Sequence, residues 1–141
     1  MSITRELLAQ YGDIVEEINE IHKDIKKTED DIAKLIEEGI VIDKVKGGLG
    51  GIQGFKIEGF PEKEYNHRKD LLQKKKNKLI KVENSLLEVE DEIETFVESI
   101  SISRDRRIFR EIYLERKTQQ QVADEMYIDR SLVSKIISKY L

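Results

Sequence analysis

Apolar residues recur at alternating intervals of three and four positions across residues 4–38. This is the heptad spacing of a helix that buries one stripe against a partner helix and leaves its charged face in water. A helix of that length would span about 50 Å, too long for its stripe to stay exposed. The stripe consists of Leu7, Tyr11, Ile14, Ile18, Ile21, Ile25, Ile32 and Leu35, with Thr28 in one slot.

A second heptad stripe lies between Pro61 and residue 100, and Pro61 is tolerated in a first helical turn. The helix dipole disfavours the positive charges of the lysines at 74–76 near the helix start. We expect these lysines on a solvated face and not in contact with nucleic acid. The stripe consists of Leu72, Leu79, Val82, Leu86, Val89, Ile93, Phe96 and Ile100, with Lys75 as its polar member. Two helices of similar length predict an all-α, antiparallel helical hairpin, a coiled-coil stalk that could pair into a four-helix homodimer.

Residues 39–61, between the two helices, contain seven of the eight glycines. Gly39 is placed to end the first helix as its C′ residue. The β-prone runs 40–42 and 55–57 predict a small β-hairpin at the tip. A phosphate-binding loop is excluded, because no GxxxxGK[ST] motif is present. The segment is therefore either a plain connector or a protein-binding tip, the latter favoured by three apolar residues: Leu49, Ile52 and Phe55.

The periodicity changes after Ile100. Ser103 is a candidate N-cap for a short amphipathic helix over residues 104–116. Ile108, Ile112 and Tyr113 are expected on its inward face.

Two further helices with a three-residue turn between them are predicted at the C-terminus. Thr118 and Gln121 match the capping box S/T-x-x-E/Q, which would open a helix of about eight residues. Asp129 is a suitable N-cap for the final helix, residues 130–141. Its inward residues would be Val133, Ile136, Ile137 and Tyr140, with Ala123 at the crossing and Ile128 in the turn. A short helix, a tight turn and a longer helix form a helix-turn-helix.

Residues 118–137, TQQQVADEMYIDRSLVSKII, resemble the helix-turn-helix of sigma-factor region 4. Residues 40–141 resemble small phage and prophage regulators of Gram-positive bacteria, of the ArpU/RinA-like kind, most closely over residues 106–123 and also in the glycine stretch. Such relatives often have glycine where this chain has Tyr127, because the turn favours a left-handed backbone.

The heptad stripes and the change of period after Ile100 predict two domains. They are a helical hairpin over residues 1–100, with its Gly-rich connector at residues 39–61, and a helix-turn-helix domain over residues 101–141 that resembles sigma region 4. The resemblance implies a phage-encoded, sequence-specific DNA-binding transcriptional regulator, with the coiled-coil stalk serving oligomerisation or partner binding. By analogy with region 4, RNA polymerase would be a partner.

A recognition helix presents its N-terminal side chains to base edges in the major groove, where Arg and Lys read guanine and Ser reads less selectively. The candidates share the face opposite Val133 and Ile137: Arg130, Ser131, Ser134, Lys135 and Ser138. An ordinary solvated helix face is the alternative for Arg130 and Lys135. Further phosphate candidates are Gln119 and Gln120 at a helix N-terminus and, more weakly, Arg104, Arg106, Arg107 and Arg110. We expect these arginines also to pair with Asp105 and Glu111.

Charge is distributed unevenly along the chain. Residues 1–100 hold 16 Lys+Arg and 23 Asp+Glu, a net charge of −7, whereas residues 101–141 hold 9 and 6, a net charge of +3. A basic C-terminal region points to an anionic partner, here double-stranded DNA.

Composition excludes several other classes. The chain has no cysteine and therefore no disulfide, thiolate metal site or cysteine nucleophile. With His22 and His67 as the two histidines, we expect no histidine-rich metal site and no cofactor. The acidic residues have the spacing of helix-surface pairs with lysine and no serine-aspartate arrangement accompanies either histidine, so we expect no enzyme. No apolar run approaches the roughly 18 residues of a membrane span, and the N-terminus lacks a signal-peptide pattern, so a cytoplasmic protein is expected.

Two alternative functions stay open. One is a phage small terminase-like DNA-packaging protein, although in those proteins the DNA-binding module usually precedes the hairpin and here it follows. The other is a protein-interaction module that does not bind DNA.

Overall fold

The computed structural model describes residues 2–48 and 62–141, without the side chains of residues 40–48. These residues form helices and no strand, which confirms the all-α class. Within them, no helix is long and apolar enough to cross a membrane. The elements are α1 (Arg5–Ala9), α2 (Tyr11–Gly48), α3 (Glu62–Glu98), α4 (Ser103–Phe109), the π-helix η1 (Arg110–Leu114), α5 (Gln119–Met126) and α6 (Arg130–Tyr140).

The chain divides into two compact units. One comprises Met1–Asn19 with Asn84–Leu141, and the other comprises Glu20–Glu83. Helices α2 and α3 contribute residues to both units. The predicted boundary between residues 100 and 101 lies inside the first unit, and the two-domain division stays a prediction.

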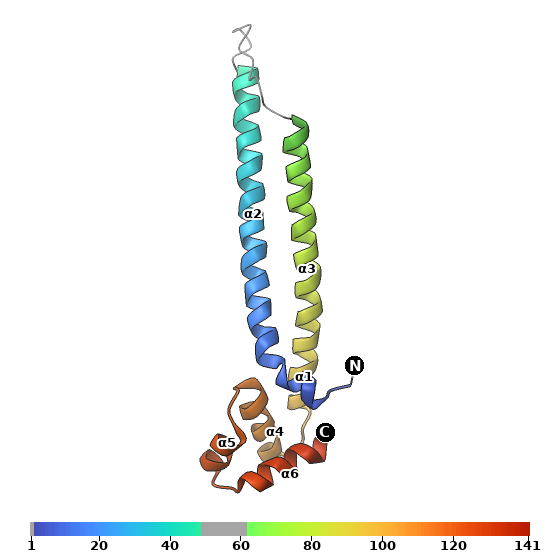
Figure 1. The fold of residues 1–141 in the computed structure, drawn as a ribbon, viewed down its shortest axis with the longest axis vertical. Coiled ribbons are helices and arrows are strands. Elements are labelled where there is room, and N and C mark those ends of the chain that lie inside the picture. Colours follow the sequence, from blue (N-terminus) through green and yellow to red (C-terminus); the bar gives the residue numbers. More distant parts are fainter. Residues whose placement is uncertain (1, 49–61) are drawn as a thin grey trace. The chain divides into compact units, whose positions relative to one another are not determined.

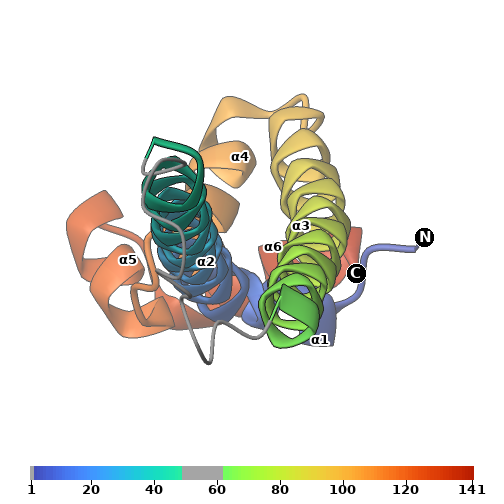
Figure 2. The same ribbon diagram turned by 90° about the horizontal axis from the view of Figure 1, so that it is seen from above.

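Within the unit Glu20–Glu83, α2 and α3 lie side by side (Figure 1), and the view from above shows the same pairing (Figure 2). His22 Nδ1 lies 3.4 Å from Glu83 Oε2, and Glu29 Oε1 lies 3.5 Å from Lys76 Nζ. Because the partner number falls as the number along α2 rises, the helices run antiparallel. The predicted stripe of α2 is buried in this unit at Ile21, Ile25, Thr28 and Leu35.

Thr28 fills a polar slot in this apolar stripe without leaving its hydroxyl unpaired. The residue is only 1% exposed, and its Oγ1 donates a 2.8 Å hydrogen bond to the carbonyl oxygen of Asp24, one turn earlier. A buried hydroxyl is tolerated when it is hydrogen-bonded, and Thr or Ser inside a helix often bonds this carbonyl.

The predicted stripe of α3 is only partly correct. Lys75 is exposed and Val82 is 45% exposed, although both were placed in the seam. The half-buried side chains one position later, Lys76 and Glu83, pair with α2 instead. The covered positions still repeat every seven residues, but the second one in each repeat lies four residues after the first and not three. The same shift buries Val97 completely and leaves the predicted Phe96 half-buried.

The prediction that Gly39 ends the first helix is wrong, because α2 continues to Gly48. Residues 40–42, predicted as a strand, are helical. Gly39 is buried against α3, and a Cβ placed on it would lie 2.6 Å from the Tyr65 hydroxyl oxygen. Glycine is therefore needed for the close approach of a side chain, not for a left-handed helix end. The rest of the predicted tip, including residues 55–57, lies outside the described residues.

The N-terminal helix is interrupted where one continuous helix was predicted. Helix α1 is N-capped by Thr4, whose Oγ1 accepts a 3.1 Å hydrogen bond from the Leu7 amide, and α2 begins after Gln10. Leu8 is fully buried, whereas the predicted seam residue Leu7 is half-buried. The core of this unit also contains Ile93, Val97, Ile108, Phe109, Val122, Val133 and Ile137.

The helix predicted over residues 104–116 consists of two elements, α4 and the π-helix η1. The Glu115 amide donates a 3.0 Å hydrogen bond to the carbonyl oxygen of Arg110, five residues earlier. A turn closed by such a bond contains one residue more than a turn of α-helix. Ile108 and Phe109, which precede the wider turn, are fully buried. Ile112 and Tyr113 lie within it and are only half-buried, because the wider turn changes the helical phase.

The predicted N-cap of this helix is also wrong. Ile102 occupies the N-cap position with no side-chain cap, and Ser103 is the first helical residue. The Arg106 guanidinium donates a 2.9 Å hydrogen bond to the Ile100 carbonyl oxygen. This bond ties the start of α4 to the chain that leaves α3.

Candidate nucleic-acid interface

The turn between α5 and α6 (Figure 1) contains a residue with a left-handed backbone, which such a tight turn favours. Tyr127 has φ 58° and ψ 43°. The next amide, that of Ile128, donates a 3.0 Å hydrogen bond to the Ala123 carbonyl oxygen, which closes the end of α5. Ala123 is only 1% exposed and Val133 is fully buried, so the small residue allows the two helices to pack closely.

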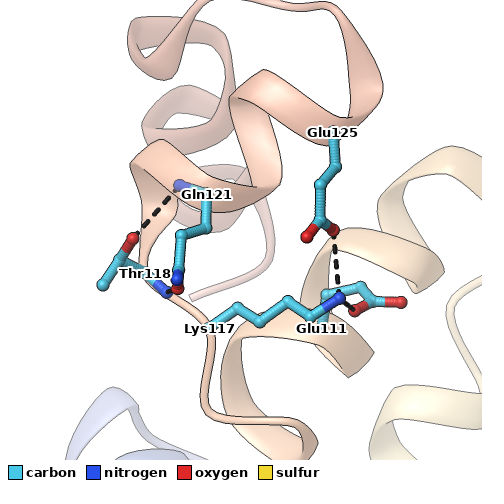
Figure 3. A network of polar contacts seen from close by, with 5 residues as sticks. All are labelled: Glu111, Lys117, Thr118, Gln121 and Glu125. Carbon is cyan, nitrogen blue, oxygen red and sulfur yellow. Dashed lines mark hydrogen bonds and ion pairs between the residues drawn. The ribbon is translucent and has the colours of Figure 1, made fainter.

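The predicted capping box at the start of α5 is confirmed (Figure 3). Thr118 Oγ1 accepts a 3.1 Å hydrogen bond from the Gln121 amide, and Gln121 Oε1 accepts a 2.9 Å hydrogen bond from the Thr118 amide. The two bonds satisfy donors that a helix start leaves unpaired and fix where α5 begins.

Lys117 joins the π-helix to α5, as Figure 3 shows. Its Nζ lies 2.6 Å from Glu111 Oε2 and 3.0 Å from Glu125 Oε2. The hydrogen bond to Glu111, and next the one to Glu125, raise the pKa of Lys117. Glu111 therefore pairs with Lys117 and not with the arginine cluster as predicted.

Asp105 is a fully buried residue of α4 that holds α6 against this helix. Its Oδ2 accepts a 2.5 Å hydrogen bond from the Tyr140 hydroxyl and lies 3.8 Å from Lys139 Nζ. Its Oδ1 accepts a 3.3 Å hydrogen bond from Arg104 Nε, the ion pair predicted for this cluster. The hydrogen bond to Asp105 raises the pKa of Tyr140. These contacts fix which side of α6 faces outward.

The outward side of α6 carries all five residues predicted to contact bases. The inward side is buried at Val133, Ile136 and Ile137, and α6 contains no acidic residue. The structure brings together five exposed side chains, Arg130, Ser131, Ser134, Lys135 and Ser138.

The two glutamines predicted to contact phosphate differ in their surroundings. Gln119, the first residue of α5, is half-buried. Gln120 is exposed, and its Nε2 donates a 2.9 Å hydrogen bond to Asp124 Oδ1 within the same helix. Their position at a helix start fits anion binding, but Gln120 would have to release Asp124 first.

The four predicted phosphate-contacting arginines divide into two pairs. Arg104 is paired with Asp105, and Arg106 is half-buried and bonded to the Ile100 carbonyl, so both have structural roles. Arg107 and Arg110 are exposed and form no ion pair within the described part of the chain.

Arg5 also lies at this surface, although sequence reasoning did not select it. Its Nη2 donates a 2.7 Å hydrogen bond to Ser138 Oγ on the outward side of α6. The two residues are 133 positions apart, and nothing local in the sequence indicates that α1 reaches α6.

Arg116, a second residue that the sequence did not single out, anchors the loop before α5. Its Nη2 lies 2.9 Å from Asp13 Oδ1 and its Nη1 lies 2.9 Å from Glu16 Oε1. A Cβ on Gly12 would lie 1.7 Å from Arg116 Nε, so the guanidinium crosses α2 at a glycine. Its backbone has a positive φ of 58°. These contacts assign Arg116 a structural role.

No group of three or more His, Cys, Asp or Glu side chains within residues 2–48 and 62–141 is arranged to hold a metal ion. No protein-family profile matches the chain, and no curated protein or solved structure is significantly similar to it.

Proposed function

We propose that this protein is a sequence-specific, double-stranded DNA-binding transcriptional regulator in which α5, the turn and α6 act as a helix-turn-helix. The observation that carries the proposal is the two-sided character of α6. One side is buried against the rest of its unit, while the other exposes Arg130, Lys135 and three serines with no acidic residue in the helix.

The proposed mechanism follows from the dimensions of the major groove, which accepts one α-helix. Arg130 at the start of α6 and Lys135 one and a half turns later would donate to guanine O6 and N7, while the two serines between them tolerate several bases. Arg107 and Arg110 would neutralise phosphates, because neither is engaged in an ion pair within the described residues.

Internal contacts support this role by fixing the two helices. The capping box sets the start of α5, Lys117 ties α5 to η1, and Asp105 ties α6 to α4. A DNA-reading helix needs such rigid support, because base readout depends on hydrogen bonds of defined geometry.

The helical hairpin is proposed to form a homodimer. On α3, Leu71 and Val82 are 52% and 45% exposed. Their separation corresponds to about three helical turns, which places both on one face of the helix. A second copy would cover these two apolar side chains, and a two-fold dimer would bind two half-sites. Phage origin and a contact with RNA polymerase rest on the sequence resemblance alone.

Binding to random duplex DNA at two salt concentrations tests the proposal. Phosphate contacts predict affinity that falls steeply as salt rises, whereas absence of salt-dependent binding would favour a protein-interaction module. The 94% exposed Tyr127 and the nearby Asp124 and Asp129 are the features that favour that second candidate.

Light scattering tests the assembly. The proposal predicts a dimer that Leu71→Asp with Val82→Asp converts to a monomer. A ring of roughly eight or more copies would instead favour a terminase-like packaging protein, since such rings close by cyclic symmetry.

A further inference from the structure

We infer that Arg5 is a DNA-backbone contact beside the proposed recognition helix, a role that rests on the proposed function. Arg5 is the first residue of α1. This helix is held in place by a cap at its start and by a buried residue on its inward face. Thr4 caps its first turn, and Leu8 is fully buried in the core that also contains Val133 and Ile137. Helix α1 is thus fixed to the same core as α6.

The guanidinium of Arg5 lies at the outward side of α6. Its Nη2 donates a 2.7 Å hydrogen bond to Ser138 Oγ, and Ser138 shares its exposed side with Ser134 and Lys135. Burial raises the pKa of the Tyr113 hydroxyl, and the positive charge of Arg5 opposes that rise. Through its contact with Ser138, Arg5 adds a cation to this surface that the net charge of residues 101–141 does not include.

This cation is available to an anion. Within the described residues Arg5 forms no ion pair, whereas Arg116 is engaged by both Asp13 and Glu16. A guanidinium has five N–H donors in a planar arrangement, and the bond to Ser138 uses one of them. The remaining donors suit the two oxygens of a phosphate group.

Ser138 lies about two turns beyond Arg130, a rise of roughly 12 Å along α6. A recognition helix contacts base edges with its N-terminal residues. With the start of α6 at the base edges, Ser138 and Arg5 would lie near the phosphates of the DNA backbone.

Fluorescence anisotropy of labelled duplexes, measured between about 50 and 200 mM KCl, tests this assignment. Arg5→Gln keeps a donor for Ser138 and removes the charge. It should make the slope of log affinity against log salt less negative by about 0.9, the value for one lost phosphate contact. The loss should be equal on selected and random duplexes, because phosphate contacts carry no sequence information. Lys27→Gln, which removes an exposed charge on α2, should change neither quantity.

Arg5→Lys separates charge from structure. The lysine keeps the cation, so it should keep the wild-type slope even where both variants unfold at a lower temperature. A merely structural role predicts that Arg5→Lys and Arg5→Gln change binding alike, which would overturn the assignment. An unchanged slope for Arg5→Gln, in a protein whose wild type binds steeply, would overturn it and leave the proposed function intact. Absence of salt-dependent binding by the wild type would overturn both.

Discussion

The hydroxyl of Tyr140 donates a 2.5 Å hydrogen bond to the fully buried carboxylate of Asp105, which joins the last turn of α6 to the first turn of α4. A carboxylate removed from water destabilises the fold unless its oxygens are paired. Both oxygens are paired here, one with Arg104 and the other with Tyr140 and Lys139. The orientation of the proposed DNA-reading helix therefore depends on this buried group.

Replacing Asp105 with alanine should lower the free energy of unfolding by about 1–3 kcal/mol, because its partners lose their acceptor. Tyr140→Phe should also lower the unfolding midpoint, since Oδ2 would retain Lys139 alone. Denaturant unfolding followed by circular dichroism measures both. Tyr127→Phe is the matched control, because Tyr127 is 94% exposed and its hydroxyl should not matter. Wild-type stability in Tyr140→Phe would show that Asp105 does not anchor α6.

Stability should fall at alkaline pH. Burial raises the pKa of Tyr11 above its ordinary value of 10.0, helped by the hydrogen bond to Glu94, and burial likewise raises the pKa of Tyr113. A pKa raised in the folded state means that the protonated form stabilises the fold. This contribution is fully present below about pH 10 and is lost as pH rises toward the folded-state values. The unfolding free energy, measured at several alkaline pH values, should decline less steeply in Tyr11→Phe than in wild type. An identical decline in both proteins would contradict the stabilising role of the protonated Tyr11 hydroxyl.

Gly39 and Tyr65 should be energetically coupled. An alanine within an unobstructed helix is about 1 kcal/mol more favourable than glycine. At Gly39, however, the added Cβ would lie 2.6 Å from the Tyr65 hydroxyl oxygen, so Gly39→Ala should lower stability. In a Tyr65→Ala background the same substitution should raise stability. A double-mutant cycle by chemical unfolding measures this reversal, and equal effects in both backgrounds would refute it.

Local patterns predicted the parts of the fold that local forces determine. The heptad spacing placed Ile21, Ile25 and Leu35 on the buried side of α2, and the Thr118–Gln121 box set the start of α5. The inward side of α6 followed from the same periodicity. Tyr127 was expected in a position that favours glycine, and the structure keeps the left-handed turn with a tyrosine there, at a cost of about 1 kcal/mol.

Features that depend on distant parts of the chain could not be predicted in this way. Gly39 has the sequence signature of a helix end, yet it is required by Tyr65 on another helix. The π-helix after Phe109 changed the phase of the following residues, which no spacing rule anticipates. Arg5 reaches Ser138 through a tertiary contact, so the sequence could propose the candidate surface but not all of its members.

The affinity of this protein for a duplex selected from a random DNA library, compared between wild type and Arg130→Ala with Lys135→Ala, tests the central claim most directly. The double variant should lose about 1–3 kcal/mol for each guanine contact removed, and lose less on random duplex. Lys23→Ala with Lys27→Ala removes the same charge from the exposed face of α2 and should bind like wild type. Equal affinity of all three proteins for the selected duplex would contradict the assignment of α6 as the helix that reads DNA.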